Sequence, residues 1–368
     1  MTPAELSRTV LRSVRGAVED RELSVPVPAR IVVRPPKRPG AGDYASNVAL
    51  QLAGPAGRPA REVAEILRKR LAGSPGIDRV EIAGPGFLNF TLGDGALVDL
   101  VRQILTQGAS YGVSYGASHG VSHRASSGAH PYAMSPSGAV DRGARDVVVA
   151  EALARIDAAV GDGVQPSAHQ RPDGPHGPHE PDESHGPDEL AALVARLGSD
   201  EARWVLLRPA AHDPVRIPER PVQREGNPRF LVQYAYARVR ALVRNADDLG
   251  FASLPGEVLG DDLGAVPASR PAQLAALGDR IRELHGLLAT YPSVIEVAAR
   301  LRAPDRVVRH LEATAEAFFR WHDGCPPLPV GEQKPLAVHR ARLALAEAAG
   351  TVLANGLRLL GISAPEHL

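Results

Sequence analysis

The sequence has a single cysteine, Cys325, among its 368 residues. One cysteine excludes an internal disulfide framework and a zinc site built from several cysteines, and this usage is typical of a reducing compartment. The first residues, MTPAELSRTVLRSV, lack the apolar segment of a signal peptide, and we expect no apolar run long enough to span a membrane. We therefore predict a cytoplasmic protein that needs no metal, cofactor or membrane.

The sequence also lacks an excess of charge of either sign, because 42 Lys and Arg residues balance 42 Asp and Glu residues and the pI is near 7.3. This balance excludes a protein that coats nucleic acid without specificity. The basic excess lies in residues 1–100 and 201–368, whereas residues 101–200 are acidic. Any contact with RNA must therefore be a local patch, and a role on DNA is not expected.

Residues 1–107 are predicted to form a small α/β domain. Apolar residues recur at helical spacing from residue 3 to about residue 18 and again after Pro59, which indicates two amphipathic helices. Short segments rich in β-branched and aromatic residues indicate strands between and after these helices, the last two of them joined by a Gly-Pro-Gly turn. The expected strands are 29–34, 78–84 and 86–92.

Residues 108–189 are predicted to be a flexible, degenerate connector. Two stretches, ASYGVSYGASHGVSHRASSGAH and QPSAHQRPDGPHGPHEPDESHGPDE, are too poor in apolar residues to offset the entropy of ordering the chain. The second stretch contains four histidines, but a Pro- and Gly-rich segment does not fix the geometry of metal ligands, so no metal site is expected there. These histidines are His169, His176, His179 and His185.

Residues 190–368 are predicted to form an all-α helix bundle. One helix is expected to begin with Asn227 as its N-cap and Pro228 at its first position, and to end near Gly250. The stretch ARLALAEAAGTVLANGLRLLG has apolar residues at every third or fourth position, and Gly361 is expected to stop this last helix. The fold class is therefore predicted to be α+β, a small α/β domain followed by a helix bundle.

The strand GFLNFTL is expected to present Phe87 and Asn89 outward, because alternate residues of a strand face opposite sides. With the other face packed on helices, an exposed ring beside an amide could stack on an unpaired base and hydrogen-bond its edge. The alternative is that Phe87 packs under a neighbouring loop. The face expected to be buried consists of Leu88, Phe90 and Leu92.

The helix after Pro228 carries a basic stripe with spacings of three and four residues. Such a stripe could follow a phosphate backbone, but a charge stripe is more often a solvated face or, here, a seam against another domain. The stripe consists of Arg229, Gln233, Tyr236, Arg240 and Arg244. The opposite, buried face is expected to contain Leu231, Tyr234, Ala235 and Leu242.

Several collinear segments resemble arginyl-tRNA synthetases, and together they are more specific than any single motif. GDYASNVALQLA (42–53), REVAEILRKRL (61–71) and VEIAGPGFLNFTL (80–92) resemble the additional N-terminal domain of that family. A further set of segments resembles the helical anticodon-binding domain of the family. This domain is named DALR after a motif that DEAR at 200–203 matches here. These segments are SDEARWVLL, NPRFLVQYAYARVRALVR, YPSVIEVAAR, AEAFFRWHDGC and ARLALAEAAGTVLANGLRLLGISAPEHL.

The resemblance implies roles for individual positions. Phe87 and Asn89 match the outward residues with which the family reads the tRNA corner formed by the D-loop. Trp321, His322 and Leu368 match the aromatic segment and the final residue with which it reads the anticodon loop. The chain departs from the family at two of these positions, since His322 replaces a common tyrosine and Leu368 a common methionine. A planar ring and a large apolar side chain are retained, so stacking on bases is still expected.

The family's catalytic domain binds ATP with a His-x-Gly-His motif at a helix N-terminus and a later lysine-bearing loop. PSGAVDRGARDVVVAEALARI resembles that motif and its helix, which makes residues 136–160 a candidate vestige of the domain. Asp141, Gly143 and Ala144 then stand at signature positions, with Asp141 and Ala144 in place of the two histidines. The alternative is an unrelated helix. No lysine occurs between Lys69 and Lys334, so the lysine-bearing loop is missing as well.

The resemblance therefore implies a non-catalytic arginyl-tRNA synthetase paralogue that binds tRNA at its D-loop corner and anticodon loop. Arginine tRNA is one candidate partner. The alternatives are a protein-interaction module or accessory subunit acting on a full-length arginyl-tRNA synthetase, and residual ligase activity.

Overall fold

The fold is that of a computed structural model, which describes residues 1–36, 42–113, 143–161, 185–220, 226–259 and 271–368. Most of both low-complexity stretches lies outside the described residues, as do Asp141, His169, His176 and His179. The described part is mostly helical, with one four-stranded antiparallel sheet near the N-terminus, which confirms the predicted fold class.

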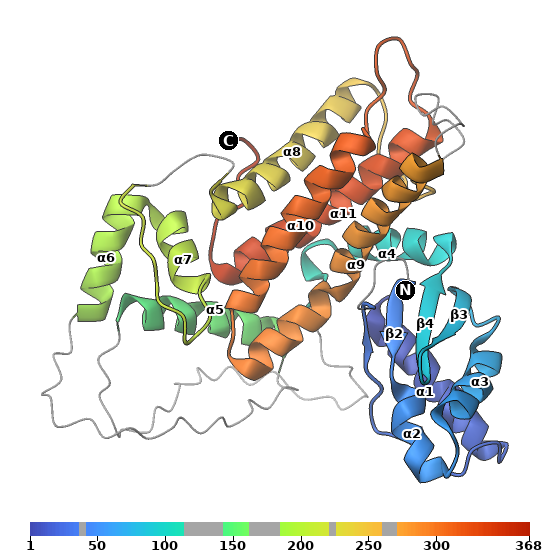
Figure 1. Cartoon of the computed structure of the whole chain (residues 1–368). Helices are drawn as coiled ribbons and strands as arrows, with labels where there is room; N and C mark the ends of the chain where they lie inside the picture. Colours follow the sequence, from blue (N-terminus) through green and yellow to red (C-terminus); the bar gives the residue numbers. More distant parts are fainter. Residues whose placement is uncertain (37–41, 114–142, 162–184, 221–225, 260–270) are drawn as a thin grey trace, which may run out of the picture.

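The N-terminal domain packs its helices against one side of the sheet, whose strand order is β1-β2-β4-β3 (Figure 1). Helix α1 begins with a capping box, because Thr2 Oγ1 accepts from the Glu5 N–H and the Glu5 carboxylate accepts from the Thr2 N–H. The elements are α1 (Pro3–Glu19), β1 (Val33–Arg34), β2 (Tyr44–Ser46), α2 (Val48–Ala56), α3 (Ala60–Leu71), β3 (Ile77–Ala83) and β4 (Phe87–Leu92). The strand β2 was not predicted from the sequence, because it has only three residues.

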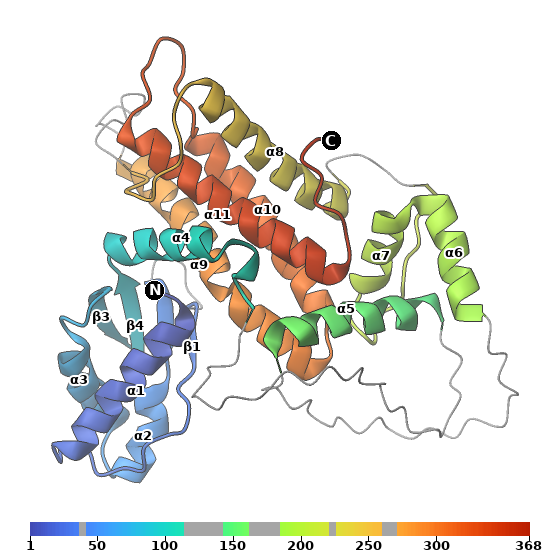
Figure 2. The same ribbon diagram turned by 180° about the vertical axis from the view of Figure 1, so that it is seen from behind.

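The remaining described helices pack into one large hydrophobic core. They are α4 (Asp94–Gln107), the short 3-10 helix η1 (Gly108–Ser110), α5 (Ala144–Val160), α6 (His185–Leu197), α7 (Ser199–Leu207), α8 (Pro228–Asp248), α9 (Pro271–Leu301), α10 (Asp305–Gly324) and α11 (Ala337–Leu360). Helices α8, α9, α10 and α11 lie side by side, and α5, α6 and α7 cover the opposite end from the N-terminal domain (Figures 1 and 2).

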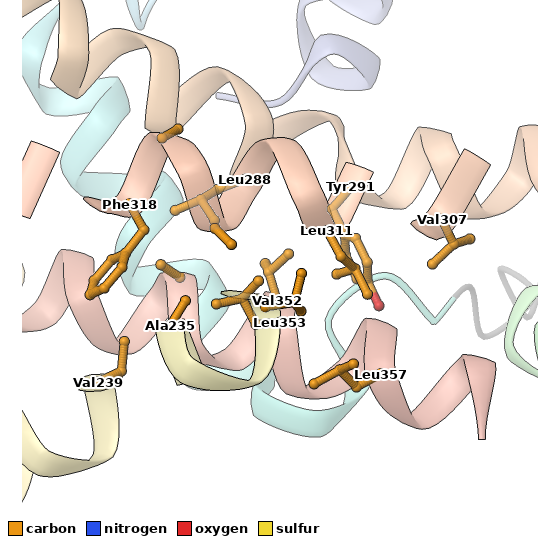
Figure 3. Close-up of a cluster of buried hydrophobic side chains, with 14 of the residues drawn as sticks. Ala235, Val239, Leu288, Tyr291, Val307, Leu311, Phe318, Val352, Leu353 and Leu357 are labelled. Atoms are coloured by element: carbon orange, nitrogen blue, oxygen red, sulfur yellow. The ribbon is translucent and has the colours of Figure 1, made fainter. Parts of the chain in front are cut away.

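Helix α11 runs through the centre of this bundle, where Val352, Leu353 and Leu357 meet apolar side chains of the neighbouring helices (Figure 3). A Cβ at Gly350 would lie 2.7 Å from Val239 Cγ1, so this glycine allows α8 to approach α11 closely. By length and composition α11 could span a membrane, which corrects the expectation that no apolar run is long enough. However, 72% of its most apolar window is buried inside the protein, as in a core helix.

The two hydrophobic cores meet inside α4. Ala96 belongs to the N-terminal core, whereas Leu100, Val101 and Ile104 belong to the helical core. Helix α5 also contributes its apolar side chains to the helical core, although it lies in the segment expected to be a connector. The sequence of α5 did not predict this, because its low-complexity neighbours gave no indication of packing. The N-terminal sheet is therefore held directly against the bundle by α4 (Figure 2).

Candidate nucleic-acid interface

Strand β4 presents one apolar and one open face. Leu88 and Phe90 are fully buried and Leu92 is 7% exposed, which confirms the predicted alternation. Phe87 is 40% exposed, so it does not pack under a neighbouring loop. Asn89 is half-buried, and its side-chain amide makes no hydrogen bond within the described residues. An aromatic ring and an unused amide thus share the open face of the sheet.

The turn before β4 fixes where Phe87 emerges. Gly84 and Gly86 have φ angles of +53° and +142°, a region that favours glycine. A Cβ at Gly86 would lie 2.9 Å from the carbonyl oxygen of Ala60, so the turn packs tightly against the start of α3. Any other residue at Gly86 would push the turn away from α3 and displace Phe87 with it.

The neighbouring strands complete the open face. The register places Ala45 of β2 on one side of Asn89 and Glu81 of β3 on the other. Glu81 forms a salt bridge of 3.3 Å with the exposed Arg79, which reduces the local negative charge. The small side chain of Ala45 leaves the space beside Asn89 open on the β2 side.

Asp43 joins this sheet to the helical bundle. Its Oδ2 accepts a hydrogen bond of 2.7 Å from the Leu92 N–H, and its Oδ1 lies 3.9 Å from Nε of Arg282 on α9. Burial raises the pKa of Asp43, against the lowering effect of the Leu92 hydrogen bond and of Arg282. The interaction between Asp43 and Arg282 places the sheet beside α9.

The first part of the predicted stripe on α8 is buried, which corrects the prediction that Arg229 and Gln233 contact RNA. Arg229 is 8% exposed and pairs with Glu201 of α7 at 2.5 Å. Gln233 is 2% exposed and donates to Asp200 and to the carbonyl of Ser363, each at 2.9 Å. Both side chains therefore form a seam that holds α7 and Ser363 against α8.

The second part of the stripe faces solvent. Arg240 and Arg244 are about one-third exposed and contact Glu366. Tyr236 is half-buried and packs on the helical core, so its ring is only partly available. The stripe therefore changes character along α8, from a polar seam to a basic surface.

An exposed aromatic stack was missed by the sequence analysis. Tyr234, expected on the buried face, is 38% exposed, and its ring stacks on Phe230 at 5.9 Å and on Phe319 of α10 at 5.4 Å between centroids. The spacing of four residues between Phe230 and Tyr234 was the available signal, because such residues are neighbours on a helix surface. We call these three residues the aromatic stack.

Two further residues with anticodon roles implied by the resemblance lie next to the aromatic stack, on α10. Trp321 is fully buried, which corrects the prediction that it contacts RNA. His322 is half-buried and packs on Phe318 at 5.7 Å. Burial lowers the pKa of His322, as does the nearby Arg238, whereas Asp323 acts in the opposite direction. Leu368 is 57% exposed at the end of the segment along α8.

The N-terminus of α5 is closed by a carboxylate. Gly143 is the N-cap, and the Ala144 N–H donates to Oε2 of Glu189 at 3.3 Å. Arg145 donates to the carbonyls of Pro209 and Ala210, each at 2.8 Å, and so fixes the loop after α7. The position that a bound anion would occupy at this helix N-terminus holds a protein side chain instead. In the part of the chain that the structure describes, no three His, Cys, Asp or Glu side chains are grouped to hold a metal.

Comparison with known proteins gives matches to both ends of the chain. The family described as arginyl tRNA synthetase N terminal domain matches residues 8–92, and the DALR anticodon binding domain family matches residues 232–368. The arginine–tRNA ligase of Frankia alni is 28% identical over an alignment of 572 residues that covers 100% of both chains. That of Paenarthrobacter aurescens is 41% identical over 49% of this chain and 30% of its own length.

A solved structure agrees in fold. The arginyl-tRNA synthetase of Thermus thermophilus superposes with a TM-score of 0.57 and 14% identity, with 100% of both chains covered. At this identity the likeness concerns the fold alone.

Proposed function

We propose that this arginyl-tRNA synthetase-related chain, which carries the N-terminal domain and the DALR anticodon-binding domain of that family, binds tRNA without attaching an amino acid to it. The observation that carries the proposal is the exposure of aromatic rings on both matched domains, Phe87 on one and Tyr234 on the other. Exposed rings stack on unpaired bases of any sequence, which makes them suited to the loops of a tRNA.

On the N-terminal domain, Phe87 and Asn89 would contact the tRNA corner. The ring of Phe87 offers a stacking platform, and the unused amide of Asn89 can donate to and accept from a base edge. The tight turn at Gly86 keeps the ring in place before RNA arrives, so little ordering entropy is lost on binding.

On the helical domain, the aromatic stack would receive bases of the anticodon loop. The rings of Phe230, Tyr234 and Phe319 already stack on one another, so a base added to the exposed side continues the series. Arg240 and Arg244 would contact phosphates further along α8. Trp321 would support the stack indirectly, because it packs on Phe318, which in turn contacts Phe319. Leu368 is exposed at the end of the segment along α8 and would offer an apolar contact to the anticodon loop there.

The absence of amino acid activation is supported by the start of α5. Ala144 has no side chain that can donate to a phosphate, and Glu189 places a negative charge at the helix N-terminus. A triphosphate brought to this position would meet a like charge instead of a free anion site.

The proposal is tested by filter binding across a panel of tRNAs at several salt concentrations, with ATP–pyrophosphate exchange in the presence of arginine measured on the same preparation. We expect salt-dependent binding with preference among tRNAs, because each phosphate contact releases counterions, and exchange at background. Absence of binding to every tRNA would refute the RNA-binding part. Exchange above background would refute the non-catalytic part and leave the first intact.

A further inference from the structure

Residues 362–368 are anchored to the bundle at their first three positions. Ile362 is 4% exposed in the helical core. The Ser363 N–H donates to Oδ1 of Asp200 at 3.1 Å, and the Ser363 carbonyl accepts from Nε2 of Gln233 at 2.9 Å. Ala364 packs against the same core. The part of the segment that can move while this anchor holds therefore begins at residue 365.

Beyond the anchor, Glu366 lies between the two solvent-facing arginines of α8. Nε of Arg240 donates to Oε1 of Glu366 at 3.1 Å, and Nη1 of Arg244 is 3.8 Å from Oε2. Nη2 of Arg244 also donates to the Glu366 carbonyl at 3.4 Å. Nη1 of Arg244 is shielded from solvent and makes no hydrogen bond within the described residues. The carboxylate therefore leaves part of the donor capacity of this arginine pair unused.

The chemistry of the pair fits a phosphate better than a carboxylate. Arg240 and Arg244 are one helical turn apart, so both can reach one anionic group or two successive phosphates. A phosphate offers more oxygens than a carboxylate and can satisfy donors that Glu366 leaves free. The side chains of all three residues are between one-third and one-half exposed, and ion pairs this exposed are weak and easily displaced.

We infer that Glu366 occupies the place of an RNA phosphate between Arg240 and Arg244, so that residues 365–368 must move aside when RNA binds there. The segment is an internal competitor that lowers the affinity of the basic surface for nucleic acid. The RNA ligand rests on the proposed function, but the competition for the two arginines rests on the contacts alone.

The test compares wild type with Glu366→Gln, which removes the charge and keeps the shape. Binding is measured at low ionic strength to a tRNA pool by filter binding and to inorganic tripolyphosphate by calorimetry. We expect Glu366→Gln to tighten both about two- to fivefold, the range that an exposed ion pair supports. In an Arg240→Gln/Arg244→Gln background the same change should have no effect, because the two arginines for which Glu366 competes are then absent.

Asp248→Asn is the matched control. Asp248 is an exposed carboxylate near the end of the same helix and forms no ion pair within the described residues. Its loss should leave both affinities nearly unchanged, and thermal unfolding should confirm that all variants fold.

Each outcome decides the inference. Weaker binding by Glu366→Gln would mean that Glu366 positions the segment for RNA, and it would overturn the competition. Unchanged binding by Glu366→Gln would also overturn it. An equal gain in affinity from Asp248→Asn would overturn it as well. If tRNA binds no variant but Glu366→Gln still gains affinity for tripolyphosphate, the competition for the two arginines stands, whereas the RNA ligand and the proposed function fail. If neither ligand binds any variant, both fail.

Discussion

The backbone N–H of Ala144 at the start of α5 donates to the carboxylate of Glu189 on α6 at 3.3 Å. The carboxylate also meets the positive end of the helix dipole. Because Glu189 is exposed, we expect Glu189→Gln to lower the free energy of unfolding by only about 0.3 kcal/mol, the low end for such an interaction. Urea unfolding measures this change.

The same variant also tests the proposal that the protein does not activate an amino acid. Glu189→Gln removes the charge that would repel a triphosphate, but it supplies no donor at Ala144. ATP–pyrophosphate exchange should therefore stay at background in the variant as in wild type. Exchange that rises in the variant would mean that the remainder of a catalytic site is present and that Glu189 alone blocks it.

Truncating Phe87 should weaken tRNA binding without affecting stability. Its ring is already 40% exposed, so Phe87→Ala removes a stacking platform and little core. We expect the free energy of tRNA binding to weaken by about 1 kcal/mol, the low end for base stacking, which corresponds to a roughly fivefold higher Kd. Asn89→Ala should act in the same direction. Thr91→Ala, on the same face of β4, is the control, and equal effects of Thr91→Ala and Phe87→Ala would contradict a specific contact.

Side-chain exposure could be predicted from the sequence for β4 but not for α8. A six-residue strand with one covered face obeys the period of two, so the face on which Phe87 lies was predictable, although a covering loop was not excluded. Helix α8 is covered from more than one side, by α10 and α11 and also by α7 and residues 362–368. The helical period fixes which residues share a face, but it does not say how many faces are covered. Arg229 was therefore placed wrongly outside and Tyr234 wrongly inside.

Disruption of the aromatic stack should weaken tRNA binding by the helical domain. Tyr234 is the central ring, so Tyr234→Ala separates Phe230 from Phe319. We expect about a tenfold loss of tRNA affinity, within the range of roughly 1–3 kcal/mol for a stacked base. Leu249→Ala removes a comparably exposed apolar side chain at the end of the same helix and should bind normally. Normal binding by Tyr234→Ala would remove the stack from the interface.

Trp321 should behave as a core residue. It is fully buried and packs beside Phe318 at 6.0 Å between ring centroids. Trp321→Ala should cost about 3–5 kcal/mol in the free energy of unfolding, as for other large buried aromatics, whereas Trp321→Phe should cost less and retain RNA binding. Loss of binding by a stably folded Trp321→Phe would instead support the direct contact that the family resemblance implied.

Two buried histidines predict that acid destabilises the protein. Burial lowers the pKa of His285 and of His310 from 6.5 to about 4. Between these values the unfolded chain binds protons that the folded protein does not, so stability falls as pH decreases from about 7 to about 4, by up to roughly 3 kcal/mol per histidine. His310→Phe keeps a ring that can stack on Tyr291 and should make this dependence less steep in urea unfolding, with the contribution of His285 remaining. Replacement of the exposed His212 by Gln should leave the dependence unchanged. An equally steep dependence in His310→Phe would mean that His310 is protonated in the folded state.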